Sequence, residues 1–363
     1  MGDVSMQIDE FLKKMVECGA SDAHLKVGMP PGLRVSGQLR PQGGEPLRPQ
    51  DTEEIARALL DEEQWKKFDE SGDLDCSYSI AGVARFRLNV MRQRGSISLV
   101  LRNIPAKVPT FEDLGLPDIC KTLASKPRGL VLVTGPTGSG KSTTLAAMIN
   151  LINSSMQGHI LTMEDPIEFL HRDNKCYINQ REIGSDTVDF NEALRRALRQ
   201  DPDVILIGEL RDLESIGLAV TAAETGHLVL GTLHTTSAMK TIDRVVNVFP
   251  PEQQTQIRMQ LAGTLQGIVA QTLIPKIAGG RVAALEILVA TDAVRAMIRE
   301  NKAAQLVSVM QTGKKYGMQL LEDHLNRLIA AKTISYEQAV EKANSPETIR
   351  RPGDVQNPVG VGV

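Results

Sequence analysis

The octapeptide Gly135-Pro-Thr-Gly-Ser-Gly-Lys-Ser142 constrains the fold of this chain more than any other stretch. It matches Gly-x-x-x-x-Gly-Lys-[Ser/Thr], the pattern of a phosphate-binding P-loop. The apolar run Leu130–Thr134 before it predicts a strand, and Thr143–Leu151 after it predicts a helix. Strand, tight turn and helix is the geometry that the motif needs. A chance glycine-rich turn is the alternative, and the two fitting flanks weigh against it.

The loop chemistry points to a nucleotide with a metal ion. Glycines let backbone N–H groups converge on phosphate oxygens, and the helix N-terminus adds a positive dipole end. Lys141 is expected to reach the β- and γ-phosphates, and the Ser142 hydroxyl is expected to bind Mg²⁺. The sequence therefore predicts ATP and Mg²⁺ as cofactors. The predicted nucleotide-binding residues are Gly135, Pro136, Thr137, Gly138, Ser139, Gly140, Lys141, Ser142 and Thr143.

A chain of 363 residues favours two domains. Residues 1–103 predict a small α+β domain with an antiparallel sheet, because helical patterns at 5–18 and 51–70 are followed by strand-like runs. These runs cover 74–80, 83–92 and 96–102, and shorter extended runs cover 24–27 and 33–39. Residues 104–117 hold three prolines and a glycine and predict the linker.

From about residue 118 to 290 helices and strands alternate, which predicts an α/β domain with a mostly parallel sheet; with its C-terminal helices this domain covers residues 118–344. Its candidate strands are 130–134, 159–163, 204–207 and 228–232, and its C-terminal helices are 292–300, 302–311, 318–331 and 336–343. Residues 345–363 lack periodicity and predict a disordered or loosely attached tail.

The composition of the chain argues against nucleic-acid binding, a cysteine metal site and a membrane span. A net charge of −3 and a pI near 6.1 give no general basic surface, so no nucleic-acid partner is expected. The four cysteines have no metal-ligand spacing and predict free thiols in a reducing cytosol. No stretch approaches 18 apolar residues, so no transmembrane segment is expected, and the N-terminus has no signal-peptide pattern.

Acidic residues follow two of the predicted strands. Asp203-Val-Ile-Leu-Ile-Gly-Glu209 is an apolar strand ending in an acid, as in a Walker B strand that aims its carboxylate at Mg²⁺. Asp203 starts that strand and lies at the wrong end for the metal. Glu164 and Asp165 end another strand, where they could polarise water beside the γ-phosphate or belong to a solvated acidic loop.

Three further side chains are candidates for the site. His234 lies just beyond the strand 228–232, where it could sense a γ-phosphate, whereas His227 precedes that strand. Arg85 and Arg87 alternate with Phe86, so both point to one face of a strand. They could be ordinary surface ion-pair residues or arginine fingers that complete a neighbouring nucleotide site.

Four segments together resemble the boxes of the secretion ATPase family. They are Gly135–Ser142, Glu164-Asp-Pro-Ile-Glu168, Gly208-Glu-Leu-Arg-Asp212 and Thr232-Leu-His-Thr-Thr-Ser-Ala238. Gly19-Ala-Ser-Asp-Ala-His-Leu25 and Pro30-Pro31 also resemble the first domain of that family. The similarity extends to about residue 345 and is strongest to the branch that retracts type IV pili.

The resemblance implies a PAS-like N-terminal domain and a RecA-like ATPase domain, assembled as a homohexamer. It implies a hexameric motor for pilus retraction and twitching motility, at the cytoplasmic face of the inner membrane, with a pilus platform protein as partner. It also leaves room for other pilus ATPases as partners. Glu164 would be the base, Glu209 the Walker B acid and metal residue beside Ser142, and His234 part of the His box. Arg85 and Arg87 would complete the site.

Three rivals remain open. Pilus assembly ATPases of the same family carry a four-cysteine zinc insertion, whereas residues 274–281 here contain no cysteine. Accessory retraction ATPases match the Thr232–Ala238 box less well. A RecA-like nucleic-acid motor is disfavoured by the weak basicity. One departure concerns Ala293-Val-Arg-Ala-Met-Ile298, where Ala296 replaces the asparagine usual in retraction ATPases.

Overall fold

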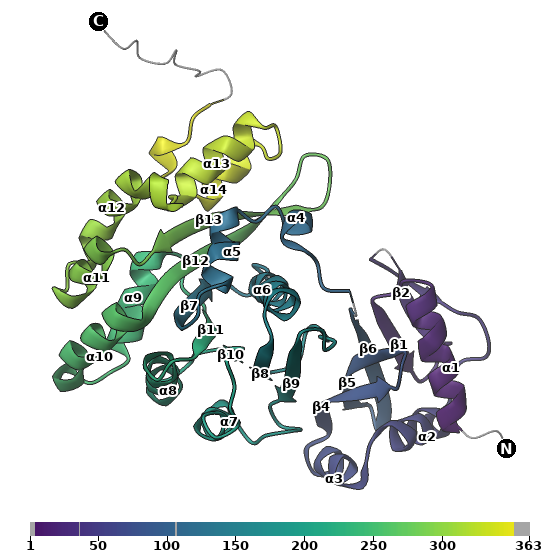
Figure 1. The fold of residues 1–363 in the computed structure, drawn as a ribbon. Helices are drawn as coiled ribbons and strands as arrows, with labels where there is room; N and C mark the ends of the chain where they lie inside the picture. Colours follow the sequence, from purple (N-terminus) through teal and green to yellow (C-terminus); the bar gives the residue numbers. More distant parts are fainter. Residues whose placement is uncertain (1–3, 36, 106, 352–363) are drawn as a thin grey trace, which may run out of the picture. The chain divides into compact units, whose positions relative to one another are not determined.

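The computed structural model describes residues 4–35, 37–105 and 107–351. The chain forms two compact units (Figure 1), one from the residues up to Lys107 with Glu168–Leu170, and one from the remainder. Within the described residues, no helix is both long and apolar enough to span a bilayer.

The first unit is an antiparallel sheet of six strands, in the order β3-β2-β1-β6-β5-β4, with three helices. The strands are β1 Asp22–Lys26, β2 Gly32–Val35, β3 Gln38–Pro41, β4 Asp73–Ile80, β5 Ala84–Gln93 and β6 Ser96–Ile104; the helices are α1 Val4–Glu17, α2 Pro49–Leu59 and α3 Glu62–Ser71. Side chains alternate along its strands between the core and the exposed face. On β5, Phe86, Leu88 and Val90 are fully buried, while Arg87 between them is exposed.

The single helix predicted for residues 51–70 is two helices. Asp61 begins the second one, since its side chain accepts the Gln64 N–H at 2.8 Å. The Gln64 side chain in turn accepts the Asp61 N–H at 3.1 Å, which completes a capping box. The hydrophobic spacing continues across this break, so periodicity alone did not reveal it.

The second unit is a sheet of seven strands, in the order β13-β12-β7-β11-β10-β8-β9, parallel except for β13. The strands are β7 Gly129–Thr134, β8 Gly158–Glu164, β9 Cys176–Glu182, β10 Val204–Ile207, β11 Leu228–Leu233, β12 Leu265–Pro275 and β13 Arg281–Val289. The helices are α4 Phe111–Leu114, α5 Asp118–Ala124, α6 Lys141–Ser155, α7 Phe190–Ala197, α8 Leu213–Glu224, α9 Ala238–Asn247, α10 Pro251–Thr264, α11 Asp292–Arg299, α12 Leu306–Thr312, α13 Leu321–Ala330 and α14 Tyr336–Lys342.

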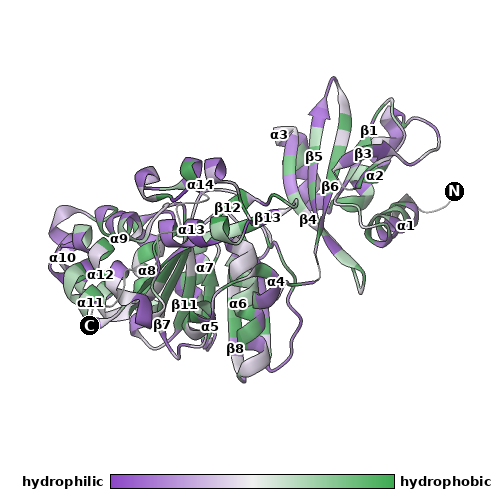
Figure 2. Cartoon of the chain, turned by 90° about the horizontal axis from the view of Figure 1, so that it is seen from above, coloured by the Kyte–Doolittle hydropathy of each residue, from purple (hydrophilic) through white to green (hydrophobic). Residues whose placement is uncertain are grey.

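Helices cover both faces of this sheet, which explains why its central strands β7, β10 and β11 are buried throughout and mostly apolar (Figure 2). On β7, Leu130 and Leu132 face the core shared with α7–α10, whereas Val131 and Val133 face the core shared with α5 and α6. The four predicted strands are present. The strands β9, β12 and β13 were missed because polar residues interrupt them.

The predicted linker and tail are both more structured than expected. Within residues 104–117, Ile104 ends β6, and α4 buries Phe111 in the core of the second unit. In the tail, Ile349 is 5% exposed and packs with α13 and α14, so residues 345–351 are held by apolar burial. Residues 352–363, the rest of the predicted tail, lie outside the described residues.

The cysteines of the described chain are free thiols, as predicted. Cys120 and Cys176 are buried and Cys18 is exposed. Burial raises the pKa of the Cys120 thiol to about 12, which keeps it protonated and unreactive at neutral pH.

Candidate nucleotide-binding and hydrolysis site

The glycine-rich loop joins β7 to α6 in the strand–turn–helix arrangement that the motif requires. Gly135, Gly138 and Gly140 have φ values of 143°, 76° and 86°, a range that residues with a Cβ rarely adopt. A Cβ on Gly135 would also lie 2.2 Å from the backbone oxygen of Gln271. The loop therefore requires glycine at its first position for both conformation and space.

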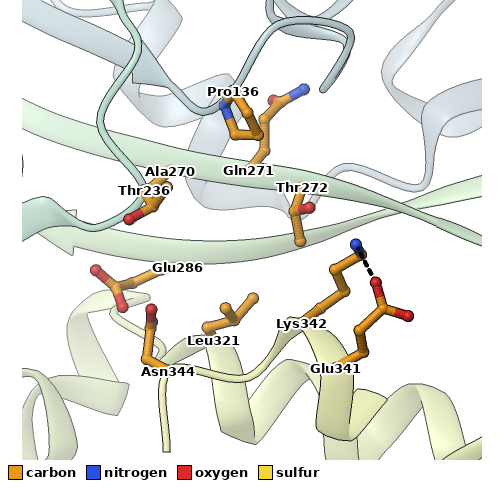
Figure 3. Close-up of a pocket in the computed structure, with 10 residues that line it drawn as sticks. All are labelled: Pro136, Thr236, Ala270, Gln271, Thr272, Glu286, Leu321, Glu341, Lys342 and Asn344. Atoms are coloured by element: carbon orange, nitrogen blue, oxygen red, sulfur yellow. Dashed lines mark hydrogen bonds and ion pairs between the residues drawn. The ribbon is translucent and has the colours of Figure 1, made fainter. Parts of the chain in front are cut away.

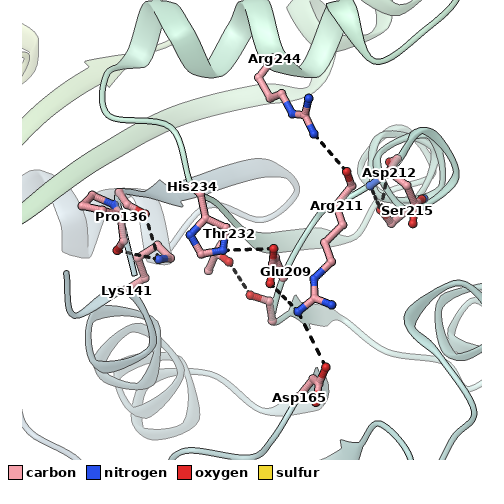
Figure 4. Close-up of polar contacts among 12 residues, drawn as sticks. Pro136, Lys141, Asp165, Glu209, Arg211, Asp212, Ser215, Thr232, His234 and Arg244 are labelled. Atoms are coloured by element: carbon pink, nitrogen blue, oxygen red, sulfur yellow. Dashed lines mark hydrogen bonds and ion pairs between the residues drawn. The ribbon is translucent and has the colours of Figure 1, made fainter. Parts of the chain in front are cut away.

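Lys141 is the first residue of α6 and folds back onto the loop (Figure 4). Its Nζ donates to the backbone oxygens of Gly135 at 2.9 Å and Pro136 at 3.1 Å. Ser142 and Thr143 follow in the first turn of the same helix. This helix has 15 residues, and the positive end of its dipole lies at the loop. The predicted phosphate-binding residues thus form one continuous loop and helix start.

Glu209 and His234 come together from neighbouring strands. Glu209 lies two residues beyond β10, and His234 lies one residue beyond β11, which pairs with β10 in parallel. His234 Nε2 is 3.1 Å from Glu209 Oε1 (Figure 4). The segments that carry them are also joined directly, since the Thr232 hydroxyl donates to the Gly208 carbonyl.

Arg211 is a further charged residue of this cluster that the sequence did not single out. Its guanidinium is 2.8 Å from Glu209 Oε2 and 3.9 Å from Asp165 Oδ2. The Glu209 side chain, 22% exposed, is therefore held by a cation on one oxygen and by His234 on the other. Arg211 occurs in the Gly208–Asp212 box, but no periodicity or spacing distinguishes it from a surface arginine.

Glu164 ends β8 at the same edge of the sheet. Its Oε1 accepts hydrogen bonds from the Thr162 hydroxyl at 2.6 Å and from Gln180 Nε2 at 3.2 Å. Across the sheet, the order β7-β11-β10-β8 places the P-loop, His234, Glu209 and Glu164 in succession. Strand spacings of about 4.8 Å separate these positions, so Glu164 lies farthest from the loop.

Two residues lie at the opposite end of the strands. Asp203 Oδ2 accepts the His159 N–H at 2.8 Å, at the amino end of β8. His227 Nδ1 is 2.9 Å from the Ala222 carbonyl, beside the amino end of β11. Both contacts join loops to the sheet, away from the nucleotide edge.

Arg85 and Arg87 lie on β5 of the first unit. An Arg85 guanidinium nitrogen donates to the Ser77 hydroxyl at 2.7 Å, and Arg87 Nε is 3.8 Å from Asp75. Both partners are on the neighbouring strand β4. These cross-strand contacts hold the two side chains on the face away from the core.

Gln271 and Glu286 are buried polar residues that the sequence analysis missed. They are 4% and 6% exposed, on β12 and β13. Gln271 Nε2 donates to the Ser139 carbonyl at 2.6 Å, and Glu286 accepts the Ala238 N–H at 2.7 Å. Each interrupts an otherwise apolar run, which is the signal that could have found them.

Known proteins resemble this chain over almost all of its length. The family model described as type II/IV secretion system protein matches residues 70–354. The type IV pilus retraction ATPase PilT of Pseudomonas aeruginosa is 54% identical, over 94% of this chain and 99% of that one. The type IV pilus ATPase PilU of the same organism is 41% identical, over 95% and 91%. A solved structure of the pilus retraction motor PilT with bound ADP matches with a TM-score of 0.88 and 48% identity, over 94% and 98%.

These findings confirm the predicted fold class, an α/β protein with a RecA-like P-loop ATPase domain and a smaller N-terminal α+β domain, which was predicted to be PAS-like. They also confirm the resemblance that the four boxes indicated. Because the family model covers most of the chain and a relative above 50% identity covers nearly all of it, this chain belongs to the family of type II/IV secretion system proteins, as one of its ATPases.

Proposed function

We propose that this protein is an ATP-hydrolysing motor that powers retraction of type IV pili and hence twitching motility. One observation carries the proposal: a complete P-loop faces a Glu209–His234 pair at one edge of a RecA-like sheet, in a chain whose relative PilT matches end to end. The accessory ATPase PilU is a weaker candidate, at 41% rather than 54% identity.

Nucleotide binding would redirect the donors of the loop. Lys141, which donates to the carbonyls of Gly135 and Pro136, would donate instead to the β- and γ-phosphates. The positive-φ glycines expose backbone N–H groups, and the start of α6 adds its dipole. All of these groups interact through charge and hydrogen bonds, which is what phosphoryl transfer needs.

Mg²⁺ fits the available donors. Ser142 and Glu209 offer a hydroxyl and a carboxylate, both hard oxygen ligands, and Glu209 would bind partly through water. Among the described residues no group of three or more His, Cys, Asp or Glu side chains could hold a metal. The ion would therefore rely on phosphate oxygens and water, as Mg²⁺ does in nucleotide sites.

Glu164 is the proposed base and His234 the proposed γ-phosphate sensor. The Thr162 and Gln180 donors fix the Glu164 carboxylate, so it can orient a water for attack. His234 Nε2 lies 3.1 Å from Glu209 Oε1, so a change at the γ-phosphate would alter the contact that holds the Walker B acid. Arg85 and Arg87 would supply positive charge to the site from the N-terminal domain.

We propose a homohexamer that works at the cytoplasmic face of the inner membrane, against a platform protein of the pilus. Its domains would be the N-terminal domain 1–103, the linker 104–117 and the ATPase domain 118–344, followed by the tail 345–363. ATP binding would close one domain on its neighbour, and hydrolysis would release it. Activity would then require the assembled ring, so a fully active isolated monomer contradicts the proposal.

Deletion in the native host separates retraction from assembly. Retraction predicts lost twitching with surplus surface pili, whereas an assembly ATPase predicts absent pili. The turn between β12 and β13, residues 276–280, contains no cysteine for the zinc insertion of assembly ATPases. Phosphate release stimulated by DNA or RNA, with steep salt dependence, would instead support a nucleic-acid motor.

A further inference from the structure

We infer that Gln271 and Glu286, on the β12–β13 hairpin, are positioning residues of the ATPase site. Gln271 holds the P-loop, and Glu286 holds the start of α9, the helix that follows His234. The inference rests on the proposed ATPase reaction at this site. Both residues lie outside the four sequence boxes.

Gln271 joins the loop to the helix after it. Its Nε2 donates to the Ser139 carbonyl at 2.6 Å, and its Oε1 accepts the Thr144 hydroxyl at 2.9 Å. Both ends of the buried amide are therefore used, one in the loop and one in α6. The backbone of Gln271 also lies against the first loop residue, because its oxygen occupies the space of a Gly135 Cβ. Strand β12 thus fixes the loop at its beginning and at its end.

Glu286 holds the other loop of the site. It is paired with Ala270 across the hairpin, so its side chain points to the face opposite that of the neighbouring Gln271. Figure 3 shows this arrangement, with Gln271 on the side of Pro136 and Glu286 on the other side of the strands. Its Oε1 accepts the N–H of Ala238, the first residue of α9. A carboxylate is favoured at this position by the helix dipole.

The hairpin is suited to this role because it is firmly held. Strand β12 pairs with β7, which leads into the P-loop, and with β13 over nine residue pairs. On its outer part, Ile274 and Ala284 are buried against Leu321 and Leu325 of α13. A cavity of about 250 Å³ adjoins these contacts, lined by Thr236, Glu286 and Asn344 among others (Figure 3). One element therefore spans the two nucleotide loops and the C-terminal helices.

The roles predict two different kinetic defects. Gln271→Met keeps the length of the side chain but removes both amide hydrogen bonds, so the loop loses its binding geometry. We expect the KM for ATP and the Kd of a fluorescent ADP analogue to rise about tenfold, with kcat within threefold. Glu286→Leu releases the loop that carries His234, so we expect kcat to fall about tenfold with the ADP affinity within threefold. Glu286→Gln keeps an acceptor for the Ala238 N–H and should restore kcat to within twofold.

Gln266→Met is the matched control, since Gln266 is the same residue type on the same strand but donates to the Arg128 carbonyl at 3.1 Å. It should leave both KM and kcat unchanged. Equal effects of Gln271→Met and Gln266→Met, or equal losses in Glu286→Leu and Glu286→Gln, would overturn the inference.

Thr144→Val is a second test variant if Gln271→Met folds poorly, because it removes the hydrogen bond between Thr144 and Gln271 from the α6 side. The two changes should be non-additive in the ADP affinity, since they share one hydrogen bond. Additive effects would contradict the role. Full-length wild type that releases no phosphate would refute the proposed function itself. Active wild type, inactive Lys141→Ala and normal Gln271→Met would refute only this inference.

Discussion

His234→Ala should lower kcat without weakening ADP binding. In the structure His234 makes a polar contact with Glu209, since its Nε2 lies 3.1 Å from Glu209 Oε1. The contact can contribute no more than a hydrogen bond to a charged group does, which is about 1.5–3 kcal/mol. The His234 side chain is 48% exposed, so water competes and the lower end applies. About 1.5 kcal/mol corresponds to roughly a tenfold fall in kcat.

The matched control is His227→Ala, at the other end of the same strand. His227 contacts the Ala222 carbonyl at the amino end of β11, far along the strand from the nucleotide edge. Its loss should reduce stability by about 1 kcal/mol and leave kcat per folded molecule unchanged. The assay is steady-state phosphate release at saturating ATP, with ADP affinity and melting temperature measured on the same samples. A kcat for His234→Ala within twofold of wild type, or an equal fall in His227→Ala, would refute the sensor role.

Four further predictions follow from individual contacts. Lys141→Ala should abolish binding of a fluorescent ADP analogue, because Lys141 is the only lysine of the P-loop and its ammonium group is proposed to bind the phosphates. Retained binding would show that Lys141 is not part of the site. Glu164→Gln should lower kcat by about 100-fold with ADP affinity intact, as expected for a base; a kcat within threefold would assign the base elsewhere. The Arg295 guanidinium donates to the Ala262, Gly263 and Ala290 carbonyls and thereby joins the end of α10 to α11. Arg295→Ala should therefore lower the melting temperature by several degrees. Arg295→Lys should recover part of that loss. Burial raises the pKa of Glu286 to about 7; the hydrogen bond from the Ala238 N–H opposes the rise, Glu322 adds to it and Lys240 opposes it. The folded state therefore holds this proton more tightly than the unfolded state, and stability falls as pH rises from about 4.5 through 7. Glu286→Gln should gain stability relative to wild type over that window in thermal melts.

The Arg295 contacts also bear on the departure at Ala296. The arginine of this segment is anchored by backbone carbonyls of α10 and of the loop after β13, none of which needs an amide at position 296. Ala296 lies next to it on α11 and is half-buried. The replacement of asparagine therefore leaves the anchoring of α11 to α10 intact in this structure.

The strands that the sequence predicted correctly are those in which buried positions carry a run of apolar residues. β10 is apolar throughout, and β7, β8 and β11 each contain an apolar run with few polar residues, so these four strands stand out in the sequence. β9 lies at the sheet edge and its second half, residues 179–182, is polar, and β12 follows α10 without a turn signal. Local pattern could not separate these strands from loops.

The sequence by itself predicts the phosphate-binding loop. The glycine spacing and the lysine of residues 135–142 leave few other roles for a loop between an apolar run and a helix. It also predicts Glu164, Glu209 and His234 individually as site residues, because acids and a histidine at or just beyond the carboxyl ends of parallel strands lie where such sheets bind ligands. Tertiary structure alone decided which of these side chains meet. The adjacency of β10 and β11 brings Glu209 to His234, while β8 keeps Glu164 one strand farther away. The pairing of β12 with β7 likewise brings Gln271 to a loop more than a hundred residues earlier. Strand order is a long-range property set by the packing of whole helices and strands, and no local spacing encodes it.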